Sequence, residues 1–324
     1  MINMQNISLK KPLVILTGPT AVGKTELSLL LAKSINGEII SADSMQVYRY
    51  MDIGTAKIKP EEREQIPHYL IDVLDPKEDF NVVLFQHMAK TAIEEIYAKG
   101  KIPIIVGGTG FYIQALLYDI SFEQTEVSAY RKELTAYYEE NGAHALHERL
   151  REIDSVSYKE IHENNVKRVI RALEFYQETG YPISKHNAEQ QEKQSPYNFE
   201  YFVLNSDRAL LYQRIEQRID LMLEEGLIAE VQNLLHYGCT PDMISMQGLG
   251  YKEIIPYLKG ECSLEDAIYI LKRDTRHFAK RQLTWFRREK EVTWIDKQLF
   301  SSTDDILQTM LRHLTSKGLY SERL

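Results

Sequence analysis

The sequence predicts an α/β fold with a parallel sheet flanked by helices, plus an inserted all-helical subdomain. Short apolar runs alternate with amphipathic stretches through residues 1–119 of the 324-residue chain, the pattern of a parallel sheet. Residues 120–198 are instead charged and helical, with many Tyr and Glu residues and no strong strand. An apolar run then returns the chain to the sheet, so we expect residues 1–119 and 199–324 to form one core.

The expected strands are short apolar runs bounded by turn residues. They are Leu13–Thr17, Glu38–Ser41, His68–Val73, Ile102–Val106, Phe199–Leu204 and Val292–Asp296. Capping residues mark several helix starts, because Asn81 and Asp207 suit N-cap positions and Ser263-x-x-Asp266 resembles a capping box. The expected helices are Lys24–Ile35, Val82–Lys99, Phe111–Tyr118, Leu210–Glu225, a long helix from Ser263 toward Arg288, and Asp304–His313.

Composition favours a globular chain without a membrane span. Hydrophobic residues make up 44% and charged residues 27%, which are ordinary values. No run approaches the roughly 18 apolar residues of a membrane span, and the polar start Met1–Lys11 predicts no signal peptide. Cys239 and Cys262 are far apart, which argues against a disulfide framework or a zinc site and fits a reducing, cytoplasmic setting.

The strongest chemical signal follows the first expected strand. Gly18–Thr25 has the pattern G-x-x-x-x-G-K-[ST] between a strand and a helix. In such a loop the backbone N–H groups and the helix N-terminus attract phosphate, Lys24 adds a positive charge, and the Thr25 hydroxyl can hold Mg²⁺. A chance glycine-rich turn is the alternative, and the strand–loop–helix context disfavours it. We therefore expect a bound diphosphate or polyphosphate.

A carboxylate follows the second expected strand. Asp43 lies in Ser41–Lys57, SADSMQVYRYMDIGTAK, at the end of a strand where ligands of open α/β sheets bind. It can serve as a base or a metal-facing acid beside the phosphate, or it can cap an Asx turn. The pattern alone leaves both interpretations open.

A second glycine-rich segment, Gly107–Gly110 (GGTG), follows the fourth expected strand and opens a helix. Its glycines allow close approach of a ligand, and Thr109 can donate to an oxyanion, although a plain strand-to-helix turn is the alternative. This strand ends without the Mg²⁺-binding Asp usual in P-loop NTPases, and the only rival, Asp72, lies on a short strand. ATP hydrolysis is therefore weakly supported.

Basic residues form two clusters despite a net charge of −8. Lys167, Arg168 and Arg171 lie on adjoining faces of one helix in the expected insertion. Between Lys272 and Lys290, eight Lys or Arg residues outnumber two acids. A stripe at three- and four-residue spacing, with interleaved aromatic residues, consists of Arg273, Arg276, Lys280, Thr284 and Arg287 with Phe278, Trp285 and Phe286. Such a surface can follow a phosphate backbone and stack on bases, or it can be a solvated helix face.

Five blocks in order along nearly the whole chain resemble the bacterial-type tRNA dimethylallyltransferase (tRNA isopentenyltransferase) family. The phosphate loop is shared with a very large class, whereas the second and fifth blocks are highly specific. The blocks are Gly18–Thr25, Ser41–Lys57, Gly107–Gly110, Lys167–Glu174 (KRVIRALE), and Gly248–Glu253 (GLGYKE) joined to Thr275–Arg288 (TRHFAKRQLTWFRR). The resemblance implies a P-loop NTPase-like core and a helical insertion that grips the anticodon arm of tRNA.

The reaction implied by the resemblance transfers a dimethylallyl group from dimethylallyl diphosphate to the exocyclic N6 amine of a tRNA adenosine. That adenosine lies immediately 3′ of the anticodon, and pyrophosphate is released. A channel through the core would admit the diphosphate at one end and the flipped-out adenine at the other. Mg²⁺ is the implied cofactor, the anticodon stem-loop of tRNA is the implied partner, and the family suggests a monomer.

The resemblance also assigns roles to residues. Asp43 would be the general base for the amine, Thr109 would lie near the bridging oxygen of the leaving group, and Lys24 would neutralise charge as pyrophosphate leaves, with Mg²⁺ at Thr25. The diphosphate-binding residues would be Gly18, Pro19, Thr20, Ala21, Val22, Gly23, Lys24, Thr25 and Arg218. The tRNA-binding residues would be Asp43, Ser44, Met45, Gln46, Thr109, Arg131, Lys167, Arg168, Arg171, Gln247, Gly248, Gly250, Tyr251, Lys280, Arg281, Gln282, Trp285 and Arg287.

The sequence departs from the family pattern at two places, and two other functions are alternatives to prenyl transfer. Asn165 stands where many relatives carry Asp, which affects a local cap, and Lys317–Leu324 lacks the Cys/His cluster of the zinc finger in eukaryotic relatives. A P-loop small-molecule or nucleoside kinase using ATP would share the core, with the insertion as a lid, but it does not explain the basic late helix. A non-catalytic RNA-binding module is disfavoured by the intact Lys24, Thr25 and Asp43.

Overall fold

A computed structural model of the chain describes residues 10–122 and 129–321. The chain divides into two compact units, one of residues 1–117 with 196–324 and one of residues 118–195. The expectation for the polar start Met1–Lys11 falls outside the described residues except for Lys10 and Lys11, as does the end of Lys317–Leu324 after residue 321. Each unit is described by itself below.

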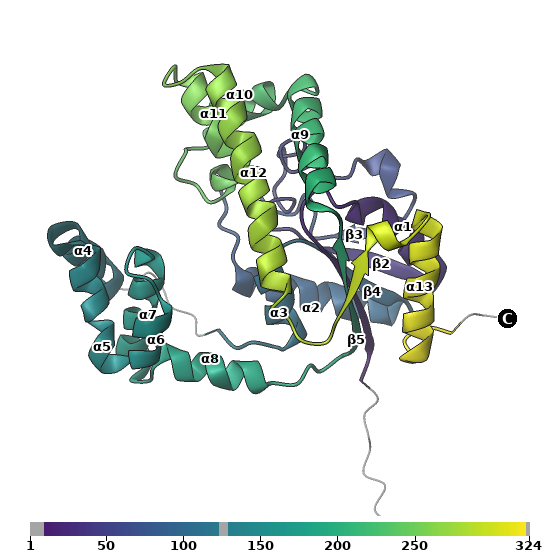
Figure 1. Cartoon of the computed structure of the whole chain (residues 1–324), viewed down its shortest axis with the longest axis horizontal. Helices are drawn as coiled ribbons and strands as arrows, with labels where there is room; N and C mark the ends of the chain where they lie inside the picture. The colour runs from purple at the N-terminus through teal and green to yellow at the C-terminus, as the bar shows by residue number, and fades with distance from the viewer. Residues whose placement is uncertain (1–9, 123–128, 322–324) are drawn as a thin grey trace, which may run out of the picture. The chain divides into compact units, whose positions relative to one another are not determined.

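The first unit is built on a six-stranded sheet in the order β3-β2-β4-β1-β5-β6. All of its strand pairs are parallel, so the carboxyl ends of the strands meet at one edge of the sheet (Figure 1). The strands are β1 (Pro12–Thr17), β2 (Gly37–Ala42), β3 (His68–Tyr69), β4 (Ile102–Gly107), β5 (Asn198–Asn205) and β6 (Val292–Asp296). The predicted α/β class with a parallel sheet is confirmed.

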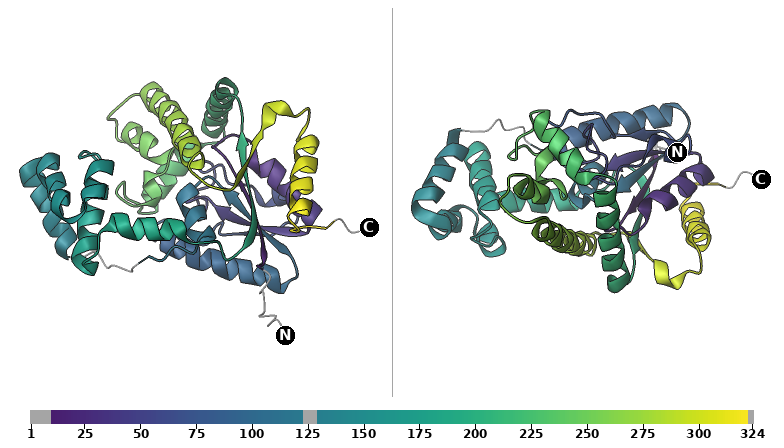
Figure 2. Two further views of the ribbon diagram at one scale, coloured as in Figure 1. Left: turned by 60° about the horizontal axis from the view of Figure 1, so that its bottom comes forward. Right: turned by 90° about the horizontal axis from the view of Figure 1, so that it is seen from above.

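Helices cover both faces of this sheet, and burial of the central strands follows from that. Helices α2 and α3 pack together on one face, and α1 and α13 pack together on the other (Figure 2). The run Leu13–Leu16 of β1 is fully buried, as a strand covered on both faces requires. The helices are α1 (Lys24–Ile35), α2 (Val82–Ala98), α3 (Gly110–Leu117), α9 (Arg208–Glu224), α10 (Leu227–His236), α11 (Tyr251–Leu258), α12 (Leu264–Phe286) and α13 (Thr303–Ser316).

The predicted helix starts agree with the capping bonds of the structure. The Asn81 side chain accepts from the N–H groups of Val83 and Leu84 at 3.0 Å each, and Ser263 accepts from the N–H of Asp266 at 3.1 Å. Helices α10 and α11 were not predicted. The described residues of the first unit also contain the 3-10 helices η1 (Pro60–Arg63), η2 (Ser245–Gln247) and η3 (Lys297–Leu299).

The predicted length of the third strand is wrong. We expected His68–Val73, but β3 ends at Tyr69 because Leu70 and Asp72 have φ values of 61° and 59°, which are left-handed and cannot continue a strand. Asp72 then forms a salt bridge at 2.6 Å with Lys57, whose side chain is only 3% exposed. The rival Mg²⁺ carboxylate is thus tied to a structural lysine beside an edge strand.

Helices are the only regular secondary structure in the described residues of the second unit. Its core contains Leu134, Leu146, Leu150 and Val169, and the buried Asp154 carboxylate accepts bonds from two serines on its neighbouring helices. The Asn165 side chain makes no capping bond at the start of α7, so the departure noted there does affect the local cap. The helices are α4 (Ala129–Glu148), α5 (Leu150–Ile153), α6 (Ser155–Glu160), α7 (Val166–Thr179) and α8 (Ile183–Glu192).

Candidate active site at the carboxyl edge of the sheet

The phosphate loop turns sharply between β1 and α1, and two glycines make the turn possible. Gly18 and Gly23 have φ values of 148° and 93°, and a Cβ on Gly18 would lie 2.6 Å from the carbonyl oxygen of Leu204. Lys24 reaches back across the loop and donates to the carbonyl oxygens of Gly18 and Pro19 at 2.9 Å each. The predicted loop therefore carries its lysine folded over its own backbone.

Three charged side chains from distant parts of the chain interact at this loop. They are Lys24 of α1, Asp43 just after β2, and Arg218 of α9. Burial lowers the pKa of Lys24 to about 7; repulsion from Arg218 adds to this effect, and Asp43 opposes it. Burial likewise lowers the pKa of Arg218. Two cations thus face one carboxylate, and the site holds a surplus of positive charge that suits a diphosphate.

Asp43 occupies the turn that the sequence left open. Its Oδ1 accepts from the N–H of Met45 at 2.9 Å, as an Asx turn requires. Burial raises the pKa of Asp43 above its ordinary value of 3.8, although the Met45 hydrogen bond and the Lys24 charge oppose the shift. A carboxylate has two oxygens, so the turn and a catalytic role are compatible.

The GGTG segment and the Asp43 turn form one structure. The Thr109 hydroxyl accepts from the N–H of Ser44 at 3.2 Å, and the Thr109 N–H donates to the carbonyl oxygen of Ala42 at 3.2 Å. A Cβ on Gly107 would lie 2.3 Å from that same carbonyl oxygen, so no larger residue fits there. Strand β4, which lies beside β1, therefore has no place for an acidic side chain at its carboxyl end. This agrees with the weak case for ATP hydrolysis.

Gln282 of α12 joins the two glycine-rich segments. Its side chain is 6% exposed, its Nε2 donates to the carbonyl oxygen of Gly108 at 2.9 Å, and its Oε1 accepts from the N–H of Thr20 at 2.9 Å. One turn further along α12, the Trp285 ring lies 2.2 Å from where a Gly110 Cβ would be. Both residues were predicted to contact tRNA, and the structure places them against the phosphate-loop edge.

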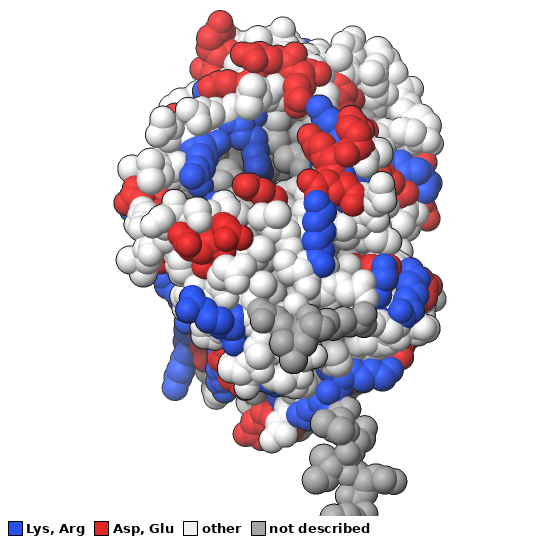
Figure 3. Space-filling view, turned by 90° about the vertical axis from the view of Figure 1, so that its right-hand side faces the viewer, with Lys and Arg blue, Asp and Glu red and all other residues white. Residues whose placement is uncertain are grey.

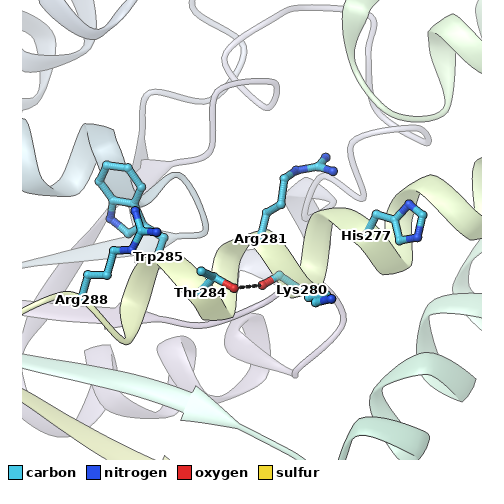
Figure 4. A pocket seen from close by; sticks show the side chains of 6 residues that line it. All are labelled: His277, Lys280, Arg281, Thr284, Trp285 and Arg288. Atoms are coloured by element: carbon cyan, nitrogen blue, oxygen red, sulfur yellow. Dashed lines mark hydrogen bonds between the residues drawn. The ribbon is translucent and has the colours of Figure 1, made fainter. Parts of the chain in front are cut away.

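A basic groove runs along α12. Its volume is about 380 Å³, and it is lined by His277, Lys280, Arg281, Thr284, Trp285 and Arg288. Figure 4 shows His277 and Arg281 on one side of the helix and the Thr284 hydroxyl donating to the carbonyl oxygen of Lys280, at 2.9 Å. Lys280, Arg281 and Arg287 are exposed, as the prediction of a basic surface requires.

Glu230 of α10 is a residue that sequence reasoning missed. Its carboxylate accepts from the N–H groups of Asp52, Ile53 and Gly54 at 2.8, 2.8 and 3.0 Å, and from the Tyr251 hydroxyl at 2.7 Å. No sequence pattern marks Glu230 as part of the site, because α10 was not predicted and a single glutamate on a helix is common. Glu230 therefore anchors the loop that follows the Asp43 turn.

Several other predicted residues pack the second family block against the fifth. The Tyr251 ring is fully buried and lies 2.6 Å from where a Gly54 Cβ would be, and Met45 lies against Gly248. Gln46 donates from its Nε2 to the carbonyl oxygen of Thr55 at 3.2 Å. Gln247 is exposed, and the Gly250 N–H donates to Glu253 at 2.9 Å.

In the second unit, the predicted basic residues divide into paired and exposed ones. Arg131 donates from its Nε to Glu174 at 2.9 Å, and Arg171 lies 3.8 Å from the same carboxylate. Lys167 and Arg168 are exposed on α7. The side chains of Lys167 and Arg168 are thus accessible to a ligand on the surface of the second unit.

Within residues 10–122 and 129–321, no group of three or more His, Cys, Asp or Glu side chains could hold a metal ion. Over the same ranges, no helix is long and apolar enough to cross a membrane.

The fold and the site define a P-loop-like α/β protein with a G-x-x-x-x-G-K-[ST] loop after β1, a neighbouring carboxylate and a helical insertion. Residues 46–289 match the family described as IPP transferase. The chain is 61% identical over 310 residues to the tRNA dimethylallyltransferase of Lachnoclostridium phytofermentans, a match that covers 95% of this chain and 99% of that relative. The chain therefore belongs to the IPP transferase family, and the resemblance seen in the sequence is confirmed.

Solved structures of related enzymes are similar over nearly their full lengths. The tRNA isopentenylpyrophosphate transferase of Bacillus halodurans is 45% identical with a TM-score of 0.71, covering 95% of this chain and 98% of its own. The enzyme of Staphylococcus epidermidis is 44% identical with a TM-score of 0.71, covering 95% and 100%. A eukaryotic dimethylallyltransferase acting on tRNA is 30% identical with a TM-score of 0.77, covering 97% and 86%.

Proposed function

We propose that this chain transfers a dimethylallyl group from dimethylallyl diphosphate to the N6 amine of the tRNA adenosine immediately 3′ of the anticodon. Membership of the IPP transferase family makes the chain a tRNA prenyltransferase and gives no support to the kinase alternative. The structural observation that carries the proposal is the meeting of Lys24, Arg218 and Asp43 at the phosphate loop.

The two cations act on the donor. The backbone N–H groups of Gly18–Thr25 hold the diphosphate, with Lys24 and Arg218 beside it. When the bond between the dimethylallyl carbon and the bridging oxygen breaks, negative charge grows on pyrophosphate. Positive groups already in place stabilise that charge without reorganisation. Thr109, at the end of the neighbouring strand, is the proposed donor to the bridging oxygen.

Asp43 acts on the acceptor. The N6 amine of adenine is a weak nucleophile because its lone pair is delocalised into the ring. As the bond from N6 to the dimethylallyl carbon forms, one N6 proton passes to the Asp43 carboxylate. Its raised pKa makes the carboxylate a stronger base than an ordinary aspartate. The products are the prenylated adenosine, pyrophosphate and a protonated Asp43.

Mg²⁺ fits this site as a partner of the diphosphate. Thr25 is exposed in the first turn of α1, and no cluster of acidic or histidine ligands occurs in the described ranges. Mg²⁺ commonly keeps several waters and binds substrate phosphates with few protein ligands. The Thr25 hydroxyl and the diphosphate oxygens would hold the ion, which would add positive charge at the leaving group.

The tRNA contacts are proposed for the exposed basic surfaces. Lys280, Arg281 and Arg287 on α12 and Lys167 and Arg168 on α7 are placed on helix surfaces that can follow the backbone of an anticodon stem-loop. Trp285, within the basic groove, offers a ring for stacking on an unpaired base. We also infer that the chain acts as a monomer in the cytoplasm; its two free cysteines fit a reducing compartment.

The test is a reaction with unmodified tRNA, Mg²⁺ and dimethylallyl diphosphate, and a parallel reaction with ATP. Nucleosides from the tRNA are then analysed by mass. We expect an adenosine heavier by one dimethylallyl group, formed without ATP. A lack of prenylated product, together with ATP turnover stimulated by a small acceptor, would contradict the proposal.

A further inference from the structure

Lys297 lies beside the phosphate loop although it is more than 270 residues away in sequence. Strand β6 pairs in parallel with β5, and β5 pairs in parallel with β1. The chain therefore leaves β6 at the same edge where β1 enters the phosphate loop. Lys297, the first residue after β6, is brought to that edge by the topology of the sheet.

The ammonium group of Lys297 contacts the loop itself. Its Nζ donates to the carbonyl oxygen of Val22 at 3.3 Å and lies 2.9 Å from where a Gly23 Cβ would be. Gly23 is the N-cap of α1, so the ammonium stands next to the positive end of that helix. A cation is disfavoured at this position unless an anion is bound nearby.

Arg214 adds a second cation to the same place. It repels Lys297, and burial together with this repulsion lowers the pKa of Lys297 below its ordinary value. Arg214 precedes Arg218 by four residues on α9, so the two arginines share one helix face. Arg218 belongs to the Asp43 cluster, and Arg214 lies one turn earlier on the same face of α9, within electrostatic reach of Lys297.

The protein balances these charges only in part. Within the described ranges, neither Lys297 nor Arg214 forms a salt bridge, and Glu26 is the carboxylate that favours the charged form of Lys297. The face shown in Figure 3 carries acidic and basic side chains intermixed, and the whole chain has a net charge of −8. Attraction of an anion to this edge must therefore come from local cations.

We propose that Lys297 and Arg214 form an outer cationic rim of the phosphate loop. In this proposal the two side chains of the rim bind the diphosphate of the prenyl donor. This proposal rests on the proposed function, because it extends the same diphosphate site by two residues. The rim is positioned to attract the diphosphate and to hold its terminal oxygens, while Lys24 and Arg218 act further inside. Residues lining the acceptor site are not part of the rim, so its loss should affect the donor and spare tRNA.

The test compares Lys297→Gln, Arg214→Gln and the double variant with wild type. Calorimetry measures the Kd of inorganic pyrophosphate with Mg²⁺, and steady-state kinetics measures the KM of each substrate. Each charge-assisted contact is worth about tenfold in affinity. We expect either single variant to raise the Kd of pyrophosphate and the KM of dimethylallyl diphosphate about tenfold, with kcat and the KM of tRNA within about twofold.

Two controls separate charge from structure. Lys297→Arg keeps the charge and should stay close to wild type in the Kd of pyrophosphate. Lys259→Gln removes the same charge from an exposed position after α11 and should change nothing. Equal melting temperatures would show that all variants fold alike.

The outcomes also distinguish the two proposals. An unchanged Kd of pyrophosphate in the double variant would overturn the rim, as would a rise in the KM of tRNA alone. A wild-type protein that transfers no prenyl group, yet loses pyrophosphate affinity in the variants, would sink the proposed function and leave the rim intact.

Discussion

The two edges of the sheet differ in which charged groups are buried and in how those groups are paired. At the amino edge, Glu38 at the start of β2 is 1% exposed and is met by Lys99 at 2.9 Å, by Lys101 at 2.7 Å and by the Tyr69 hydroxyl. At the carboxyl edge, Lys24 and Arg218 face a single carboxylate, Asp43. At the amino edge a buried carboxylate is met by two lysines that are partly exposed to solvent, whereas at the carboxyl edge the two cations are themselves desolvated by burial and share one carboxylate.

A second strand repeats the pattern at the amino edge. Glu200 near the start of β5 is fully buried, and Lys317 pairs with it at 2.7 Å. Removing one partner of a buried ion pair lowers the free energy of unfolding strongly, because it leaves an uncompensated buried charge. We therefore expect buried charges that serve only stability to be paired within the protein. The buried cations at the other edge are instead desolvated without a carboxylate for each, which supports the proposal that a diphosphate binds there.

The largest expected effect comes from Asp43→Ala. Loss of a general base commonly costs 10²–10⁴ in rate, so we expect kcat for prenyl transfer to fall about 10³-fold. Binding of tRNA should survive, because the exposed basic surfaces are untouched. Single-turnover assays and filter binding measure the two quantities. Unchanged turnover would refute the role of Asp43 as the base.

Lys24→Ala should rank second. Removing one preorganised positive group at a leaving anion costs about 10²–10³ in rate, so kcat/KM for dimethylallyl diphosphate should fall by that factor. The free energy of unfolding should hold or rise, since the variant removes a cation from a site with surplus positive charge. Thermal melts and kinetics check both. A large loss of stability would place Lys24 among the structural charges instead.

The same residue predicts a pH dependence. The pKa of Lys24 is lowered to about 7, so its ammonium is lost as the pH rises through that value. The affinity of the free wild-type protein for pyrophosphate should therefore fall above pH 7. In Lys24→Ala this part of the pH profile should be absent, and its persistence would assign the profile to another group.

Glu38→Gln tests the amino edge. It should lower the free energy of unfolding by about 1–3 kcal/mol, because buried hydrogen bonds to a charged group are lost. Activity at a temperature where the variant is folded should stay at the wild-type level. Urea unfolding and the prenyl transfer assay measure the two effects. Lost activity in a folded variant would break the division between the edges.

The stability difference should depend on pH in a defined direction. Burial raises the pKa of Glu38, but the hydrogen bonds from Lys101, Lys99 and Tyr69 together outweigh it and hold the pKa below its ordinary value of 4.5. A carboxylate with a lowered pKa stabilises the folded state above the pKa of the unfolded chain, and this contribution is lost as the pH falls through the folded pKa. The wild type and Glu38→Gln should therefore converge in stability below pH 4.5.

The smallest effect is expected for Glu230→Gln. A neutral amide weakens the three backbone N–H bonds that hold residues 52–54, so the loop after the Asp43 turn loses its anchor. We expect the KM of tRNA to rise about tenfold, with the KM of dimethylallyl diphosphate unchanged. Steady-state kinetics with each substrate varied in turn measures this split. A rise in the donor KM would contradict it.

Most of the sheet was predictable because its signals are local. Runs such as Leu13–Leu16 are apolar on both faces, and only a strand covered by helices on both sides requires that. The phosphate loop is equally local, since its glycines and Lys24 lie within eight residues. The third strand was predicted too long, because Leu70 and Asp72 adopt left-handed backbone that their residue types do not indicate.

The remaining parts of the site depend on tertiary contacts. Glu230 lies 176–178 residues from the N–H groups that it accepts from, and Gln282 lies 262 residues from Thr20. Lys297 follows an edge strand with nothing in its own neighbourhood to mark it. The contacts of these residues depend on what the fold brings next to them. The family resemblance named Gln282, but only as a tRNA contact, and no spacing pattern marks Glu230 or Lys297.

The most direct test of the contrast is the melting temperature with rising magnesium pyrophosphate. A ligand that binds only the folded state raises stability by an amount set by its concentration and Kd. Wild type and Glu38→Gln should both gain stability by the same amount, and Lys24→Ala should gain almost none. Equal gains in all three proteins, or no gain in wild type, would contradict the account that the carboxyl edge keeps its charge for a diphosphate.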